Sequence, residues 1–161
     1  MSEIIDIAQV ENDEREKVVG ILSQLDFFKK FSNYEKKRIA SQHAHFFSFK
    51  NGDNIIEEGT RDTAFFILVS GQVSVVKQGI DSPLVRLAQG QFFGEMAFLT
   101  GMIRTSGVVA DSEVVVIRVD QKLMSSLGIE IREKIKDQLI DKLVQDLAAT
   151  TRQLQNVSKP A

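Results

Sequence analysis

Residues 93–110 read FGEMAFLTGMIRTSGVVA and set a glycine turn, a carboxylate and an arginine within one compact segment. Gly94 lets the backbone approach an anion closely, and a short helix that starts there points the free amides of its first three residues toward that anion. Arg104 supplies a permanent planar cation with several donors for phosphate oxygens. Glu95 does not favour phosphate by its charge, so we expect its carboxylate to accept a hydrogen bond from a sugar hydroxyl. A phosphate and a hydroxyl together indicate a nucleotide.

Two hydroxyl residues, Thr105 and Ser106, follow the arginine and are placed to bond the same phosphate. A plainer interpretation of the segment stays open: Gly94 is only a turn residue, Glu95 caps a short helix, and Arg104 pairs with a surface carboxylate. The order of all these residues, after a series of predicted strands, favours the binding interpretation.

The chain around this segment changes character at about His45 and again at about Val119. Between these limits it consists of short β-branched and aromatic runs, broken by turn signals such as Asn51-Gly52-Asp53 and Ser70-Gly71. Strands at this spacing predict an all-β roll or barrel.

Helices are predicted before the β region. Residues 11–24 are charged and carry apolar residues at helical spacing, which predicts an amphipathic helix. Ser32 then provides an N-cap, with Glu35 three residues later as a capping box, before a second helix at about 33–42.

Two further helices are predicted after the β region. Asp120 caps a short helix that runs to about Leu127, and Gly128 breaks it. From Ile129 to about Asn156 the chain forms a long amphipathic helix, and residues 157–161 form a tail. The apolar stripe of the long helix comprises Ile131, Ile135, Leu139, Leu143, Leu147 and Leu154.

Composition narrows the function classes. A chain of 161 residues that is 43% hydrophobic suits one ordinary globular domain. The net charge of -2 and the lack of a basic recognition helix argue against nucleic-acid binding by this chain. The absence of cysteine removes disulfides and thiolate chemistry and suits a reducing cytoplasm, where we expect the protein to reside. No segment approaches about 20 apolar residues, so no membrane span is expected.

The segment 93–110 resembles the phosphate-binding cassette of the cyclic-nucleotide-binding domain family, whose usual pattern is Phe-Gly-Glu-(Leu/Ile)-Ala-Leu, a short spacer, then Pro-Arg-x-Ala-Thr-Val. Residues 49–73, with their turn glycines, look like the opening strands of that family. Two positions depart from its pattern, because Ile103 stands where proline is usual and Gly107 where threonine is common. The resemblance covers both the catabolite-activator-like and the protein-kinase-regulatory-subunit-like branches.

The resemblance implies an α+β, mainly β fold. We expect an antiparallel β-roll, jelly-roll-like and related to the double-stranded β-helix, with N-terminal helices, a short cassette helix and a long C-terminal helix. The predicted organisation is an N-terminal helical extension at 1–24, a cyclic-nucleotide-binding domain at 25–156 and a tail at 157–161. Within that domain the β-roll occupies about 45–119 and the C-terminal helices occupy 120–156.

The resemblance also implies roles for individual residues. Arg104 and the amides after Gly94 would hold the cyclic phosphate, Glu95 would hold the ribose 2'-hydroxyl, and the base would lie against apolar residues of the roll. Thr105 stands where a hydroxyl meets the 2-amino group of a syn guanine, which leaves cGMP open. The predicted ligand-binding residues are Gly94, Glu95, Met96, Ala97, Arg104, Thr105, Ser106, Val75, Leu87, Thr150 and Thr151.

Val75 and Leu87 are the candidates for the wall behind the base, although ordinary core packing explains them equally well. Thr150 and Thr151 lie late on the long helix, in a place that resembles where catabolite-activator-like proteins put hydroxyl residues that touch adenine across a dimer seam. Solvated helix residues are the alternative for both threonines.

We therefore predict a non-enzymatic sensor that binds cAMP in preference to cGMP and whose ligand biases the position of helix 129–156. The exposed part of this helix is expected to close on the base or to pair with a second copy in a homodimer. The output domain or partner protein is not identified by the sequence. A ligand-free interaction or dimerisation module of the same fold is the alternative.

A cupin-like metal-dependent enzyme is a more remote alternative. His43-Ala44-His45 has the His-x-His spacing of such sites, and alternation on a strand would place both imidazoles on one face. The chain has only these two histidines, so a three-histidine site is excluded, and we predict no metal and no catalytic residue.

Overall fold

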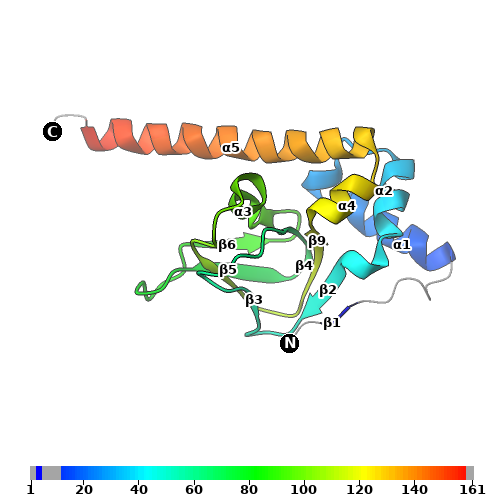
Figure 1. Cartoon of the computed structure of the whole chain (residues 1–161), viewed down its shortest axis with the longest axis horizontal. Helices are drawn as coiled ribbons and strands as arrows, with labels where there is room; N and C mark the ends of the chain where they lie inside the picture. Colours follow the sequence, from blue (N-terminus) through cyan, green and yellow to red (C-terminus); the bar gives the residue numbers. More distant parts are fainter. Residues whose placement is uncertain (1–2, 5–11, 159–161) are drawn as a thin grey trace.

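The computed structural model describes residues 3–4 and 12–158, which form a β-roll with helices on two sides (Figure 1). The strands are β1 (Glu3–Ile4), β2 (Phe46–Phe49), β3 (Asn54–Ile56), β4 (Phe65–Ser70), β5 (Gln72–Val76), β6 (Val85–Ala88), β7 (Phe92–Phe93), β8 (Gly107–Ala110) and β9 (Val114–Val119). The helices are α1 (Asn12–Ser23), α2 (Asn33–Ala40), α3 (Glu95–Thr100), α4 (Gln121–Ser126) and α5 (Ile129–Ser158), with short 3-10 helices η2 (Asp26–Phe28) and η3 (His43–His45).

The strands form two antiparallel sheets. The larger has the order β1-β2-β9-β4-β7 and the smaller has the order β3-β8-β5-β6. Together with the flanking helices they confirm the predicted α+β, mainly β roll. No helix in the described part of the chain combines the length and the apolar character that a membrane span requires.

Strand β4 separates two hydrophobic clusters. Successive side chains on a strand point to opposite faces, so a run that is apolar at every position serves both. Phe65 and Ile67 belong to the cluster shared with the helices, whereas Phe66 and Leu68 belong to the cluster inside the roll. The wholly apolar run of β4 is therefore explained by burial on both faces.

The helical cluster joins both ends of the chain. Leu22 of α1 and Phe28 of η2 pack in the same cluster as Ile135 and Leu139 of α5, and all four are almost fully buried. The predicted stripe of the long helix is thus confirmed for its first three members, whereas Leu143 is half-buried.

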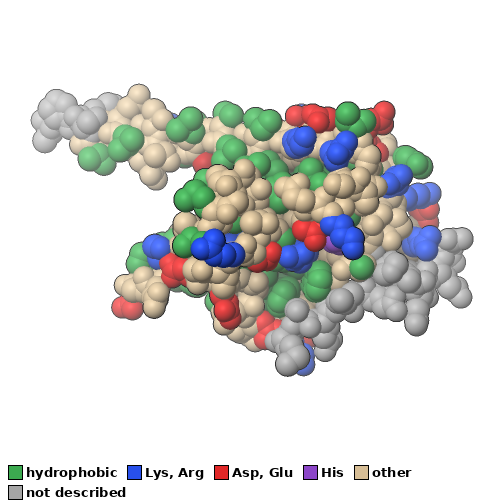
Figure 2. Space-filling model, viewed as in Figure 1, with side chains coloured by type: hydrophobic (Ala, Val, Ile, Leu, Met, Phe, Trp, Pro, Cys, Tyr) green, Lys and Arg blue, Asp and Glu red, His purple; other side chains and the backbone are tan. Residues whose placement is uncertain are grey.

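The second half of α5 projects beyond the roll (Figure 1). Leu147 and Leu154 of the predicted stripe are 68% and 65% exposed there. Hydrophobic side chains are visible along this projecting part of the helix (Figure 2). The stripe therefore packs against the roll only over its N-terminal half.

Two predicted boundaries need correction. His45 was expected to open the β region, but His43–His45 form η3 and the first strand after it begins at Phe46. Helix α5 continues to Ser158, two residues past its predicted end, so that only residues 159–161 of the predicted tail lie outside the described residues.

The capping box before α2 is confirmed. The Ser32 hydroxyl accepts from the Glu35 amide, and a carboxylate oxygen of Glu35 accepts from the Ser32 amide. The same carboxylate forms a partly buried ion pair with Lys134 of α5. Burial alone would raise the pKa of Glu35, but the hydrogen bonds from Lys134 and Ser32 outweigh it and hold the pKa below its ordinary value.

Glu35→Gln should therefore make the protein less sensitive to acid. A carboxylate whose pKa is lowered by folding stabilises the fold above its unfolded-state pKa, near 4.5, and loses that contribution as the pH falls further. We expect Glu35→Gln to lower the free energy of unfolding by about 1 to 2 kcal/mol at pH 7, and by less as the pH falls from 5 to 3. Urea denaturation at several pH values measures this difference.

Glu133→Gln is the matched control for this prediction, because Glu133 lies on α5 in an exposed pair with Lys136. The free energy of unfolding of this control should change with pH in the same way as that of the wild-type protein. Parallel profiles for Glu35→Gln as well would show that Glu35 does not contribute to acid sensitivity.

Candidate ligand-binding site

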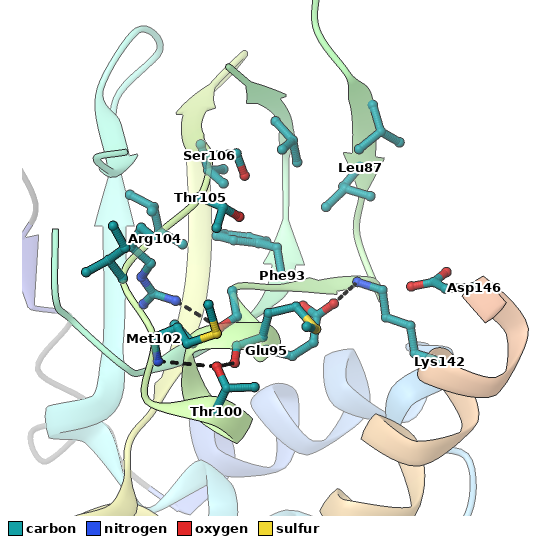
Figure 3. A pocket seen from close by; sticks show the side chains of 18 of the residues that line it. Leu87, Phe93, Glu95, Thr100, Met102, Arg104, Thr105, Ser106, Lys142 and Asp146 are labelled. Carbon is teal, nitrogen blue, oxygen red and sulfur yellow. Dashed lines mark hydrogen bonds and ion pairs between the residues drawn. The ribbon is translucent and has the colours of Figure 1, made fainter. Parts of the chain in front are cut away.

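A cavity of about 490 Å³ opens between the segment 93–106, the strands β5 and β6, and helix α5 (Figure 3). The structure brings nine of the eleven predicted ligand-binding residues to its wall. These are Gly94, Glu95, Met96, Ala97, Arg104, Thr105, Ser106, Val75 and Leu87. Residues 94 to 106 supply one side of the cavity, and β5 and β6 supply an apolar side.

Gly94 has the backbone conformation that the sequence predicted for a turn. Its φ is 82°, in the left-handed region, and it is the N-cap of α3, which begins at Glu95. A Cβ at this position would lie 2.9 Å from Arg104 Nη1 and 3.3 Å from the Ala64 carbonyl oxygen. Glycine is therefore required both for the turn and for the close approach of the arginine.

The guanidinium of Arg104 is buried, with only 4% of the residue exposed. Nη1 donates to the Gly94 carbonyl oxygen at 2.8 Å, and Nη2 donates to the Ala64 carbonyl oxygen and to Asp62 Oδ2, the last at 3.3 Å. Nε is buried and has no acceptor among the described residues. Burial lowers the pKa of Arg104, and the attraction of Asp62 opposes that shift.

Asp62 links this arginine to the C-terminal helices. Its Oδ1 accepts from Arg118 Nη2 at 2.7 Å, and Arg118 Nη1 donates to Asp120 Oδ2 at 2.9 Å. Asp120 caps α4 by accepting from the Leu123 amide, as predicted. Burial alone would raise the pKa of Asp62, but a backbone hydrogen bond from Ala64 and the two arginines hold it below its ordinary value.

Glu95 meets a cation from α5. Its Oε1 lies 2.9 Å from Lys142 Nζ, and the same ammonium donates to the Phe92 carbonyl oxygen at 3.0 Å. Asp146, one helical turn later, also lines the cavity, so α5 forms part of the wall (Figure 3). The sequence analysis missed both residues, although their spacing of four places them on one face of the predicted helix.

Thr150 and Thr151 do not line this cavity. Both lie on the exposed part of α5, where each hydroxyl donates to the carbonyl oxygen four residues earlier. Their predicted contact with a base across a dimer seam involves a second copy and stays a prediction.

The two departures from the family pattern have different surroundings. Ile103 is partly exposed at the rim of the cavity, where it contributes apolar surface. At Gly107, a Cβ would lie 3.2 Å from the Ile56 carbonyl oxygen and 3.3 Å from Val76 Cγ2. The close packing of neighbouring strands therefore accounts for the glycine at position 107.

The histidine pair does not lie on a strand, which removes the geometric argument for a cupin-like site. It lies in η3, and His45 Nδ1 is 3.1 Å from the Arg118 carbonyl oxygen. Residues 3–4 and 12–158 contain no group of three or more histidine, aspartate or glutamate side chains arranged to hold a metal ion.

Residues 46–128 match the family model of the cyclic nucleotide-binding domain. Among curated proteins, the chain is similar to the cAMP-dependent protein kinase regulatory subunit of Neurospora crassa. The two are 32% identical over 67% of this chain and 28% of the fungal protein. The chain spans about a quarter of the length of the curated relatives that it matches first.

Two solved structures illustrate the similarity of fold. A regulatory subunit of a cAMP-independent protein kinase A from Trypanosoma brucei has a TM-score of 0.65 and 26% identity, over 81% of this chain and 46% of that chain. The catabolite activator protein of Thermus thermophilus has a TM-score of 0.69 and 21% identity, over 82% of this chain and 62% of that chain. These matches confirm the β-roll architecture.

The geometry of Gly94 generates a prediction about stability. Gly94→Ala places a side chain in the left-handed region and against Arg104, so it should lower the free energy of unfolding by about 3 kcal/mol. Gly101→Ala is the matched control, because Gly101 ends α3 with a φ of 71° but has no atom within 4 Å of its Cβ position. This control should cost only about 1 kcal/mol. Urea denaturation of the two variants compares them, and equal losses would contradict a steric role for Arg104.

Proposed function

This chain belongs to the cyclic nucleotide-binding domain family, and we propose that its cavity holds a cyclic nucleotide, with cAMP preferred over cGMP. We propose further that the chain is a regulatory unit without catalytic activity of its own. The observation that carries the proposal is that two buried residues of opposite charge, Arg104 and Glu95, both line the wall of one cavity. A cytoplasmic location and the existence of an output domain or partner protein stay predictions.

The proposed phosphate site consists of the first turn of α3 and Arg104. The first amides of a helix have no acceptor within the helix, and they bind an anion readily. Nε of Arg104 also lacks an acceptor, and a buried donor without a partner is unfavourable. An equatorial phosphate oxygen would satisfy both kinds of donor and would offset the charge of a guanidinium held away from water.

The proposed sugar and base sites lie on either side of the phosphate site. Glu95 Oε1 faces Lys142, which leaves the second carboxylate oxygen to accept from a ribose hydroxyl. Val75 and Leu87 present apolar side chains from β5 and β6 for a purine to pack against. The cavity volume falls in the usual range for small-molecule sites.

The preference for cAMP is supported by the relatives, because the Neurospora crassa protein is the regulatory subunit of a cAMP-dependent kinase. The Trypanosoma brucei neighbour belongs to a cAMP-independent kinase, so the fold by itself does not determine the ligand. Arg104 and Glu95 argue against a ligand-free interaction module, because both charges are buried at the cavity. Thr105 leaves cGMP as the competing ligand.

We propose that the ligand also shifts α5. Lys142 and Asp146 of this helix line the cavity, so a bound nucleotide contacts the helix directly. A ligand shifts the equilibrium between two positions of α5 only if it binds one position more tightly than the other. Contact between the nucleotide and α5 would supply that difference in affinity.

The exposed face of α5 supports the predicted homodimer. Its apolar and hydroxyl residues recur at alternating spacings of four and three, which is the heptad pattern of a coiled coil. We call this face the α5 seam, and it consists of Ile140, Val144, Leu147, Thr151 and Leu154. At 100° per residue the seam lies on the side of the helix opposite Lys142 and Asp146. Pairing through it therefore leaves the cavity accessible.

Ligand binding is tested by calorimetric titration with cAMP and with cGMP. We expect micromolar or tighter binding of cAMP and weaker binding of cGMP. Arg104→Gln should lower the affinity by about 100-fold, because it removes charge-assisted bonds to the phosphate. Its fold is checked by circular dichroism, since Arg104 also bonds Gly94 and Ala64.

Arg86→Gln is the control for Arg104→Gln, because Arg86 is exposed on β6 and does not line the cavity. It should bind cAMP as the wild-type protein does. No heat with either nucleotide, together with an unchanged melting temperature at saturating concentrations, would overturn the proposed function.

Dimerisation is tested by sedimentation velocity at increasing protein concentration. We expect wild-type protein to dimerise and Leu147→Glu to weaken the dimer at least tenfold, because it places a charge in an apolar seam. Gln145→Glu adds the same charge away from the seam and should leave the dimer intact. A wild-type chain that stays monomeric at high concentration would overturn the seam as a dimer interface.

A further inference from the structure

Three chain segments meet beside the segment 104–106, at one end of the smaller sheet. Glu58 follows β3, Lys77 follows β5, and Thr105 precedes β8, which lies between these two strands in the sheet. Lys77 Nζ lies 2.6 Å from Glu58 Oε1 and donates to the Thr105 carbonyl oxygen at 2.7 Å. The two charged side chains therefore meet across the start of β8, one from each of its neighbours.

Glu58 is held by two donors. Its Oε1 accepts from Lys77, and its Oε2 accepts from the Gln78 amide at 3.0 Å. The hydrogen bonds from Lys77 and from the Gln78 amide hold the pKa of Glu58 below its ordinary value, so this carboxylate is charged at neutral pH. Glu58 therefore fixes the Lys77 ammonium at the Thr105 carbonyl group. We call Lys77 and Glu58 the β8 clasp.

The β8 clasp acts on the backbone that carries Arg104. The Arg104 carbonyl oxygen accepts from the Gly59 amide, and the Arg104 amide donates to the Thr60 carbonyl oxygen, both at 2.8 Å. The bond from Lys77 holds the next carbonyl group along the chain, which has no other partner in the described part of the protein. Gly107 follows shortly after, and glycine leaves the backbone free to rotate. The clasp therefore restrains a stretch that is otherwise held only at Arg104.

The orientation of Thr105 decides which groups the cavity presents to an anion. Thr105 and Ser106 line the cavity, and Figure 3 shows their hydroxyl groups directed toward it. Lys77 and Glu58 do not line the cavity, so the Thr105 carbonyl oxygen, which Lys77 binds, faces away from it. A carbonyl oxygen turned into the cavity would repel a phosphate oxygen, because both groups are acceptors.

We propose that Lys77 and Glu58 are positioning residues for phosphate binding: they hold the Thr105 carbonyl group away from the cavity and so keep the donors of residues 104–106 directed at the phosphate. This inference rests on the proposed function, because it assigns this segment to the phosphate. It adds that two residues outside the cavity wall set part of the affinity for nucleotide.

Two other roles for the β8 clasp make different predictions. If Lys77 attracts the phosphate only through its charge, removal of the opposing charge of Glu58 tightens binding. If the pair only stabilises the fold, its loss lowers the melting temperature and leaves the affinity unchanged. Ion pairs of this exposure contribute little to stability, so we expect the melting temperature to change little. Only positioning makes the loss of either residue weaken binding.

The experiment is a calorimetric titration with cAMP of wild-type protein, Lys77→Met, Glu58→Gln and the double variant. Each single variant should bind cAMP about three- to fivefold more weakly, the usual effect of one lost hydrogen bond. The double variant should bind no more weakly than Lys77→Met, because the two residues act through one contact with Thr105. Lys77→Arg should restore most of the affinity, because it keeps a donor for that carbonyl group and a cation for Glu58.

Lys37→Met and Glu16→Gln are the matched controls, because these residues form an exposed ion pair of 2.8 Å between α2 and α1 and the substitutions change the charge in the same way. Both controls should bind cAMP as wild-type protein does. Circular dichroism and melting temperature check the fold of each variant. If Lys77→Met does not fold, Lys77→Gln replaces it, and the same weakening is expected.

Unchanged affinity in folded Lys77 and Glu58 variants would overturn the inference in favour of a purely structural role. Tighter binding by Glu58→Gln would overturn it in favour of direct attraction, and equal weakening by the control variants would overturn it in favour of a general effect of charge. Losses that add in the double variant would also contradict it. In each of these cases the proposed function stands, whereas no binding of cAMP or cGMP by wild-type protein would overturn the proposed function and this inference together.

Discussion

The burial of one guanidinium constrains the site more than any other interaction. Arg104 needs acceptors away from water, and it finds them in two backbone carbonyl groups and the carboxylate of Asp62. One of those carbonyl groups belongs to Gly94, the residue that starts α3, so the arginine and the helix fix each other's position. The backbone around Arg104 is held in turn, because its carbonyl oxygen accepts from the Gly59 amide and its amide donates to Thr60.

Both charged residues of the cassette are connected to the C-terminal helices. Arg104 reaches the N-cap of α4 through Asp62 and Arg118, and Glu95 reaches α5 through Lys142. Ion pairs thus connect the cavity to the helices at two points. One connection starts from the cation Arg104 and the other from the anion Glu95. Under the proposed function, a bound nucleotide would alter the surroundings of both pairs, and this would be a physical basis for communication with α4 and α5.

Sequence analysis succeeded where the relevant contacts are local. The capping box of Ser32 and Glu35 is three residues long, and the glycine turn with Arg104 lies within one short segment, so residue order carried the information. It missed Asp62 and Lys142, because their partners lie far away in the chain and a charged residue on a helix or loop has no pattern that names its partner. It misplaced His45, because a 3-10 turn next to a strand has no distinctive periodicity.

The length of α5 turns a small rotation into a large displacement. The helix runs about 24 Å from Lys142 to its last described residue, at 1.5 Å per residue. It is held at its N-terminal half by the core and at Lys142 by Glu95 and Phe92, whereas residues 144–157 are exposed. A tilt of about 10° at Lys142 would therefore carry the far end of the helix about 4 Å, roughly three quarters of the rise of one helical turn. Any tilt about the ion pair of Lys142 and Glu95 would thus be amplified along the projecting part of the helix.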